Sequence, residues 1–277
     1  MPAQPAIPSV FVSHGAPDLV LQEAPARRFL ESLTARLPRP RAILAVSAHW
    51  ETGVPTAGAA PHPATIHDFG RFDDRLFQMR YPAPGDPALA QRAAELVTQA
   101  GLTGLTDTHR GLDHGVWVPL MLMLPDASIP VVPFSVQPHL GPAHHLQVGH
   151  ALAPLREDGV LILASGSFTH DLRRFRGQGL NAAVPADVAD FASWFGTALL
   201  EGRTADLLAY RRQAPHAAAN HPTEEHLLPL YVAMGAAGTQ WQAEHLHESA
   251  TYGMLRMDAY AFTAPGDVMH SPPARAA

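Results

Sequence analysis

The amino-acid sequence predicts an α/β fold: a single domain with a central, mostly parallel or mixed sheet, helices on both faces, and a metal site at the carboxyl ends of its strands. Three continuous apolar runs indicate this, because such runs are typical of strands buried on both faces: 9–13 (SVFVS), 43–50 (ILAVSAHW) and 160–164 (VLILA). Stretches with helical spacing of apolar residues lie between the runs, as in folds in which strands and helices alternate.

Each of these runs delivers a histidine at or just past its carboxyl end: His14, His49 and His170. Ligands of open α/β sheets bind outside the carboxyl ends of the strands. If the three strands are neighbours, the three imidazoles meet at one edge of the sheet. Neutral imidazole is the commonest metal ligand in proteins. The residues alone therefore favour a metal site.

The other elements follow in chain order. Pro38 and Pro40 close an expected helix at 24–37, and Asp86 caps a helix that starts with Pro87 and runs to about residue 100. Beyond these we expect a short helix up to residue 124, an irregular or edge strand at 129–136, helices at 143–155, 184–200, 204–213 and 220–234, and a closing strand region up to Phe262.

Composition and charge narrow the class of protein. The chain has 277 residues, 47% of them hydrophobic and 16% charged, which suits one catalytic domain over 1–277 with a core of about 8–262 and a frayed tail at 263–277. A net charge of −6 gives no sign of binding to nucleic acid or to an anionic membrane. Because the chain has no cysteine, disulfides, thiolate nucleophiles and Cys-based zinc sites are excluded. No secretory signal or membrane-spanning run is visible, so we expect a cytoplasmic protein.

Two more histidines have a supporting context. His226 lies near the start of an expected helix and would add a fourth ligand. Its neighbours Glu224 and Glu225 are first-turn acids favoured by the helix dipole, or one of them is a metal carboxylate. His114 lies in a Gly-flanked loop, where it serves acid/base chemistry or substrate contact, or is a surface residue. His221 is interpreted as a cap-region residue, and surface or packing roles are assigned to His62, His109, His139, His144, His145, His150, His216, His245, His247 and His270.

A series of short motifs in a fixed order identifies a resemblance over roughly Val10 to Phe262. They are SHGAP at 13–17, SAHW at 47–50, TIHDFG at 65–70, YPAPG at 81–85, GLDHGVW at 111–117, ASGS at 164–167 with His170, and PTEEH at 222–226 with LPL at 228–230. Together they resemble the class III extradiol ring-cleavage dioxygenases of the LigB superfamily, in the branch similar to DOPA 4,5-dioxygenase. Any one motif alone would be a weak signal, whereas the ordered set is specific.

The resemblance implies a role for each candidate residue. His14 and His49 match metal ligands, and His226 matches the residue that completes the metal shell. His170 matches the histidine that acts as acid/base beside the metal and that can itself be a ligand when substrate is absent. His114 matches a loop histidine that faces the substrate. The wider superfamily uses two histidines and one glutamate on Fe(II), so Glu225 is the alternative third ligand.

The implied reaction is cleavage of the ring of a catechol, DOPA-like or related, by O2, with no nucleic acid and no membrane as partner. Fe(II) is expected for activity, whereas Zn(II) is expected in a purified sample because it binds an all-histidine site more tightly. Two alternatives stay open: a zinc-dependent hydrolase that uses a metal-bound hydroxide, and a non-catalytic binding protein on the same fold. Arg71, Arg75 and Arg110 are candidates to hold a substrate carboxylate. The sequence leaves the choice of catechol and the oligomeric state open.

Overall fold

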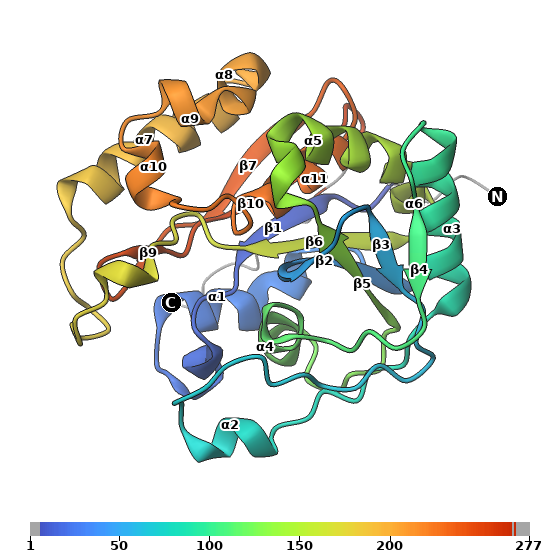
Figure 1. Ribbon diagram of the computed structural model, residues 1–277, viewed down its shortest axis with the longest axis horizontal. Coiled ribbons are helices and arrows are strands. Elements are labelled where there is room, and N and C mark those ends of the chain that lie inside the picture. The colour runs from blue at the N-terminus through green and yellow to red at the C-terminus, as the bar shows by residue number, and fades with distance from the viewer. Residues whose placement is uncertain (1–5, 268, 270–277) are drawn as a thin grey trace.

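A mixed eight-stranded sheet runs through the protein in the order β4-β3-β5-β2-β6-β1-β10-β7 (Figure 1). The structure is a computed structural model that describes residues 6–267 and 269. The strands of the large sheet are β1 (Ser9–Ser13), β2 (Ala42–Glu51), β3 (Thr56–Gly58), β4 (Leu105–Asp107), β5 (Val131–Val136), β6 (Val160–Gly166), β7 (Gln242–His247) and β10 (Ala259–Thr263). A separate two-stranded sheet joins β8 (Ala250–Thr251) to β9 (Leu255–Arg256).

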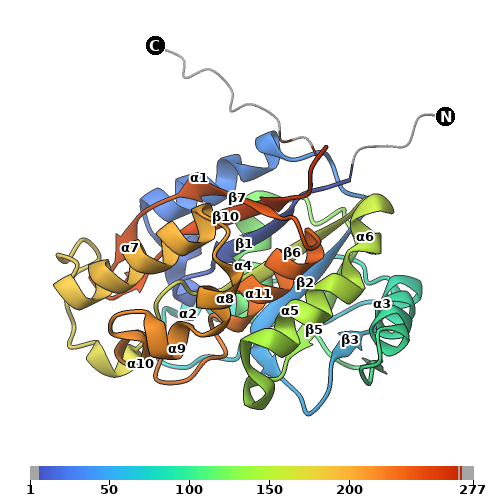
Figure 2. The same ribbon diagram turned by 90° about the horizontal axis from the view of Figure 1, so that it is seen from above.

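Helices cover both faces of the large sheet, as Figure 2 shows for α1 on one side and α3 and α5 on the other. The helices are α1 (Pro25–Leu33), α2 (Asp74–Gln78), α3 (Pro87–Gln99), α4 (His114–Met123), α5 (Gly141–Leu152), α6 (Pro154–Glu157), α7 (Ala186–Leu200), α8 (Thr204–Leu208), α9 (Tyr210–Gln213), α10 (Ala217–Asn220) and α11 (Leu228–Ala236). The predicted fold class is confirmed.

The three strands that end in histidines are neighbours, as the sequence requires for a shared site. β6 pairs in parallel with β2 on one side and with β1 on the other. The register sets Ser47 opposite Ser165, and Ser13 opposite Gly166. Because parallel strands share a direction, their carboxyl ends meet at one edge of the sheet.

Alternate residues of the central strands pack into two separate cores. Leu44 and Ile162 are fully buried in the core that also contains residues of α3, α5, α7 and α11, whereas Ile43 and Leu161 are buried in the core that contains residues of α1 and α4. This alternation follows from the two-residue period of a strand. A strand covered on both faces needs apolar residues at every position, which explains the continuous apolar runs of the sequence.

The sheet is mixed because β10 runs antiparallel to β1, and β7 antiparallel to β10. The run predicted at 129–136 forms β5, which lies between β2 and β3 rather than at the edge of the sheet. Its pairing with β3 is limited to Ala57 and Phe134. Pro133 has no N–H to donate, which fits this sparse pairing.

The prediction of one helix over 220–234 is wrong for the first half of this range. α10 ends at Asn220 and α11 begins at Leu228, with Pro229 in its first turn. The residues between them form a turn in which the N–H groups of Leu227 and Leu228 donate to the carbonyl of Glu224. Pro229 is a better helix start than Pro222 because an apolar stretch that can be buried follows it directly.

Most of the tail predicted as frayed, 263–277, lies outside the described residues. Within the described part, β10 extends to Thr263, and Asp267 forms an ion pair with the buried Arg156. Among the helices that the structure describes, none combines the length and the apolar character needed to cross a membrane.

Candidate metal centre

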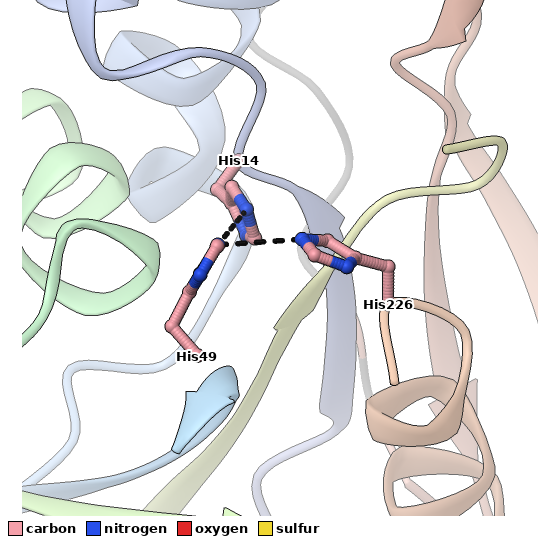
Figure 3. A group of neighbouring side chains, drawn as sticks. All are labelled: His14, His49 and His226. Carbon is pink, nitrogen blue, oxygen red and sulfur yellow. Dashed lines mark hydrogen bonds between the residues drawn. The ribbon is translucent and has the colours of Figure 1, made fainter. Parts of the chain in front are cut away.

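Three imidazole rings converge at the carboxyl edge of the sheet, and Figure 3 shows them pointing toward one another. His14 follows β1, His49 lies near the end of β2, and His226 lies in the turn before α11. The Nε2 atom of His49 is 3.0 Å from Nε2 of His14 and 3.3 Å from Nε2 of His226. One nitrogen from each ring can therefore reach a common centre.

A close backbone approach at the end of β6 places the third ring. The N–H of Ser167 donates to the carbonyl of His226 at 2.9 Å. A Cβ atom on Gly166 would lie only 2.0 Å from that carbonyl oxygen. Only glycine therefore lets the turn before α11 approach β6 this closely.

The second ring nitrogen of two of these histidines is held by an oxygen. The Ser165 hydroxyl donates to the carbonyl of Gly115, so its oxygen accepts the Nδ1–H of His14 at 3.0 Å. A carboxylate oxygen of Glu225 accepts the Nδ1–H of His226 at 2.9 Å. Both arrangements leave the Nε2 lone pair free to face the centre, as outer partners of metal-binding histidines do.

Burial keeps all three rings neutral. Desolvation, followed by the neighbouring histidines, lowers the pKa of His14 and His226 well below the ordinary value. Desolvation and His114 lower the pKa of His49 to about 3, against the opposing effect of Asp68. Neutral imidazole is the form that binds a metal. Two nitrogens at about 2.0–2.1 Å from one ion lie roughly 3.0–3.4 Å apart at ordinary coordination angles, so these residues fit a metal ion.

Two further histidines border this centre. The ring of His170 stacks on that of His226, with centroids 3.5 Å apart and planes 11° apart. Burial lowers the pKa of His170 to about 4, so its ring is neutral at pH 7. His114 is the first residue of α4 rather than part of the preceding loop, and its ring centroid is 3.9 Å from that of His49. The five predicted histidines therefore lie at one place.

A cavity of about 240 Å³ opens over the histidines. Its polar wall consists of His14, His49, Asp68, His114, Ser167, His170 and His226, and its apolar wall includes Phe69, Phe72, Leu172 and Leu255. Ligand cavities of proteins commonly measure about 300–1,000 Å³, so this one suits a molecule of about one ring. Aromatic and aliphatic walls can pack against the faces of such a ring.

Asp68 is a site residue to which the sequence assigned no role. Its Oδ1 accepts the backbone N–H of His114 at 2.9 Å, and its Oδ2 lies 3.0 Å from Nδ1 of the same residue. Burial raises the pKa of Asp68, but its contacts with the ring and the backbone N–H of His114, together with the nearby ring of His49, outweigh burial and hold the pKa at about 2. The carboxylate is therefore ionised. Its place in the TIHDFG motif was the available signal.

A second carboxylate, that of Asp113, stabilises the strand end beside the site. Asp113 is fully buried, and it accepts from the hydroxyl of Ser47 and from the guanidinium of Arg110, both at 2.6 Å. Arg110 also donates to the carbonyl of His49 at 3.3 Å and lies over the ring of Trp50. This guanidinium holds the strand end that carries His49. It does not line the cavity.

The arginines considered for a substrate carboxylate therefore lie elsewhere. Arg71 is exposed, and Arg75 is exposed and pairs with Asp73 at 2.8 Å. Within the part of the chain that the structure describes, the cavity is lined by no arginine. An arginine in a loop can form a buried ion pair that stabilises the fold, or it can bind a ligand. The sequence does not distinguish these two roles.

Histidines predicted to have packing or surface roles lie apart from this centre. His221 is buried, and its Nε2–H donates to the carbonyl of Phe168 at 3.0 Å. His144 and His145 contact Gln137 near the end of β5. The remaining ones are His62, His109, His139, His150, His216, His245 and His247, none of which lines the cavity, and His270, which is outside the described residues.

Comparison with known proteins gives one consistent family. The family model described as the catalytic LigB subunit of aromatic ring-opening dioxygenase matches residues 8–263. The chain is 44% identical to a protein of Beta vulgaris named 4,5-DOPA dioxygenase extradiol, over 92% of this chain and 96% of the relative. It is 38% identical to a protein of Escherichia coli K12 with the same name, over 83% and 85%. A crystal structure of an uncharacterized protein from Escherichia coli K12 matches with a TM-score of 0.75 and 32% identity, over 92% of this chain and 99% of the other.

Proposed function

This chain belongs to the LigB family of aromatic ring-opening dioxygenases, and we propose that it opens the ring of a catechol at a metal ion held by His14, His49 and His226. As a member of this family, the protein is an oxidoreductase that opens an aromatic ring with O2. The observation that supports this site most strongly is the convergence of three neutral imidazoles beneath a one-ring cavity.

Fe(II) is the metal we propose for activity. A bound Fe(II) would supply open coordination positions for the two catechol oxygens and the electron-transfer chemistry toward O2 that no side chain provides. Zn(II) binds such nitrogen ligands more tightly, and it has no redox chemistry. We therefore expect a zinc-loaded sample to be inactive toward O2.

The proposed acid/base residue is His170. Its neutral ring can accept the proton of one catechol hydroxyl: the O–H bond breaks, an N–H bond forms, and the ring becomes an imidazolium. Stacking on His226 fixes the plane of His170, so the ring stays beside the substrate oxygens. After the ring opens, the same imidazolium can return the proton to the product. His114 lines the same cavity, next to His49 rather than His226, and would contact a second hydroxyl.

The proposed substrate is a single-ring catechol, DOPA-like or related. The relatives from Beta vulgaris and Escherichia coli K12 both carry the name 4,5-DOPA dioxygenase extradiol. A cavity of about 240 Å³ has room for one ring, with Phe69 and Phe72 on its apolar side. A cytoplasmic location is part of this proposal.

The test starts from metal-free protein reconstituted without oxygen. Fe(II) or Zn(II) is added, then L-DOPA or caffeate in air, while O2 uptake and visible absorbance are recorded. We expect O2 uptake and a yellow ring-opened product with Fe(II) alone, lost in His170→Ala and kept in His109→Ala, whose side chain is exposed. Absence of O2 uptake with every member of a catechol panel would refute the proposal. Oxygen-independent hydrolysis by the zinc form would favour a hydrolase.

A further inference from the structure

A second cavity lies between α7 and the strands at the antiparallel end of the large sheet, where α7 packs beside β7 (Figure 2). It measures about 370 Å³, and we call it the α7 groove. Among the described residues, none lines both this groove and the cavity over the histidines. On β9 the two are separated by the alternation of a strand, because Leu255 lines the histidine cavity and Arg256 lines the α7 groove.

One wall of the groove is a face of α7 that bears mostly small side chains. Its members are spaced by three and four residues, as on one face of a helix, and they are Ala189, Ala192, Ser193, Gly196, Thr197 and Leu200. Ser193 and Thr197 are exposed, and their Cβ atoms are one turn, or about 5–6 Å, apart. Neither hydroxyl forms a hydrogen bond within the described residues, so both can bind a ligand.

The hydroxyl of Tyr260 faces the groove from β10. Tyr260 is 1% exposed, and a Cβ atom on Gly196 would lie 2.8 Å from its hydroxyl oxygen, so glycine leaves room for it. Within the described residues this hydroxyl has no hydrogen-bond partner, whereas that of the buried Tyr231 donates to the carbonyl of Leu207 at 2.7 Å. Buried polar groups are normally paired. The hydroxyl of Tyr260 therefore indicates a partner that the fold itself does not supply.

The charged groups of the groove pair with one another. The buried Asp258 carboxylate accepts two hydrogen bonds from Arg256, at 2.8 and 2.9 Å, and lies 3.1 Å from Nε2 of His245. The same guanidinium donates to Glu248 at 2.8 Å. Together the arginine and the two carboxylates carry a net charge of −1. Among the residues that line the groove, no cation is left over for a carboxylate or a phosphate ligand.

The groups that stay open in the groove both donate and accept hydrogen bonds. Nη1 of Arg256 forms no hydrogen bond within the described residues and offers two N–H groups, and the hydroxyls of the groove can serve in either role. The ring of His245 stacks on that of Tyr260, with centroids 4.5 Å apart and planes 8° apart. This pair gives the groove an aromatic surface against which C–H groups can pack.

We propose that the α7 groove binds a small neutral molecule that carries several hydroxyl groups, of the size of a monosaccharide. Hydroxyl groups donate and accept as the open groups of the wall do, and a six-membered ring can present two of them to Ser193 and Thr197 at once. A neutral molecule avoids the repulsion that an anion would meet from Asp258 and Glu248. The volume of the groove lies in the range of about 300–1,000 Å³ that is common for ligand cavities. This site does not depend on the ring-opening reaction.

The chemistry of the ligand is tested by saturation-transfer NMR on the zinc-loaded protein, which suits weak binding. The probes are D-glucose and myo-inositol, which are neutral, and D-glucuronate, which has the glucose ring with one negative charge. We expect saturable binding of at least one neutral probe. Glucuronate should bind about tenfold more weakly than glucose, because its charge adds to a wall that is already negative.

The place of binding is tested by amide chemical shifts of the ¹⁵N-labelled protein. With the neutral probe, shifts should change at 193–197 and 256–260 and stay unchanged at 112–115, at the start of α4. Tyr260→Phe and Thr197→Val should each weaken binding about tenfold, since each removes one hydrogen bond. Thr103→Val, at an exposed threonine outside the groove, is the matched control and should bind as the wild type does.

A stability measurement separates a ligand contact from a structural role. Tyr260→Phe should leave urea unfolding of the free protein unchanged, because the hydroxyl has no partner in the fold to lose. The proposal is overturned if neither neutral probe binds saturably, if glucuronate binds as tightly as glucose, or if the shifts lie at the metal centre. A loss of binding in Tyr260→Phe that only follows a loss of stability would also overturn it. Failure to cleave any catechol would refute the proposed function and leave this result standing.

Discussion

Replacing Glu225 decides whether its carboxylate binds the metal ion directly or only orients His226, which binds the metal ion. Its Oε1 accepts the Nδ1–H of His226 at 2.9 Å and also receives the hydroxyl of Thr223 at 3.0 Å. Loss of such an outer partner commonly weakens metal binding by about 10–100-fold, or about 1.4–2.7 kcal/mol of binding free energy. We expect this loss in Glu225→Ala. Glu225→Gln should lose less, because the amide oxygen still accepts the Nδ1–H.

The assay is competition for Zn(II), and for Fe(II) without oxygen, against a chelator of known affinity. His226→Ala should lose far more affinity than either Glu225 variant, since it removes one of the three nitrogens. Glu224→Gln is the matched control, because Glu224 accepts the hydroxyl of Tyr210 and contacts no ring of the site. Losses in Glu225→Gln as large as those in His226→Ala would refute the account and make the carboxylate the third ligand.

Further predictions concern stability. In Gly166→Ala the new Cβ would lie 2.0 Å from the carbonyl oxygen of His226. We therefore expect the free energy of unfolding in urea to fall by about 1–3 kcal/mol and metal binding to weaken. Wild-type values for both would contradict the close approach. Arg110→Gln leaves the buried Asp113 carboxylate unpaired and should cost about 3–5 kcal/mol, whereas the exposed Arg75→Gln should change little. Burial lowers the pKa of His145 to about 3. The unfolded chain takes up a proton there below about pH 6.5 and the folded chain does not, so stability should fall as the pH drops, by about 2 kcal/mol from this group at pH 5. Urea unfolding of His145→Gln should therefore show a smaller loss between pH 7 and pH 5, and an equal loss would contradict this.

The central strands and the histidines at their ends could be predicted from the sequence. A strand covered on both faces needs an unbroken apolar run, and β2 and β6 have one. Parallel pairing then brings their carboxyl ends together. His14 and His49 follow from this geometry once their strands are neighbours of β6.

Short and long-range features were not predictable in the same way. β3 and β4 are three residues each, too short to give a periodic signal. The position of Asp68 depends on pairing between Thr65 and Leu112, far apart in the chain. On the sequence, Arg110 is a candidate to hold a substrate carboxylate because it lies near a motif loop, whereas the structure pairs it with the buried Asp113. These placements come from tertiary packing, which local sequence patterns do not encode.

At the turn that carries His226, the sequence indicates the site residue but not the local structure. The resemblance pointed to His226 or Glu225, but the residues also suggested a helix that starts at Pro222. The turn forms instead because Gly166 admits its backbone against β6 and because α11 starts at Leu228. With the turn in place, the His226 ring faces the other two, and Glu225 contacts its outer nitrogen.

The most direct test of the central claim is an anomalous-scattering map from crystals of the Fe(II)-loaded protein, collected across the iron absorption edge. The account predicts a single peak at about 2.0–2.2 Å from the Nε2 atoms of His14, His49 and His226. A peak between His170, Glu225 and His226, or between His49, Asp68 and His114, would contradict it, because each of these sets could also hold an ion.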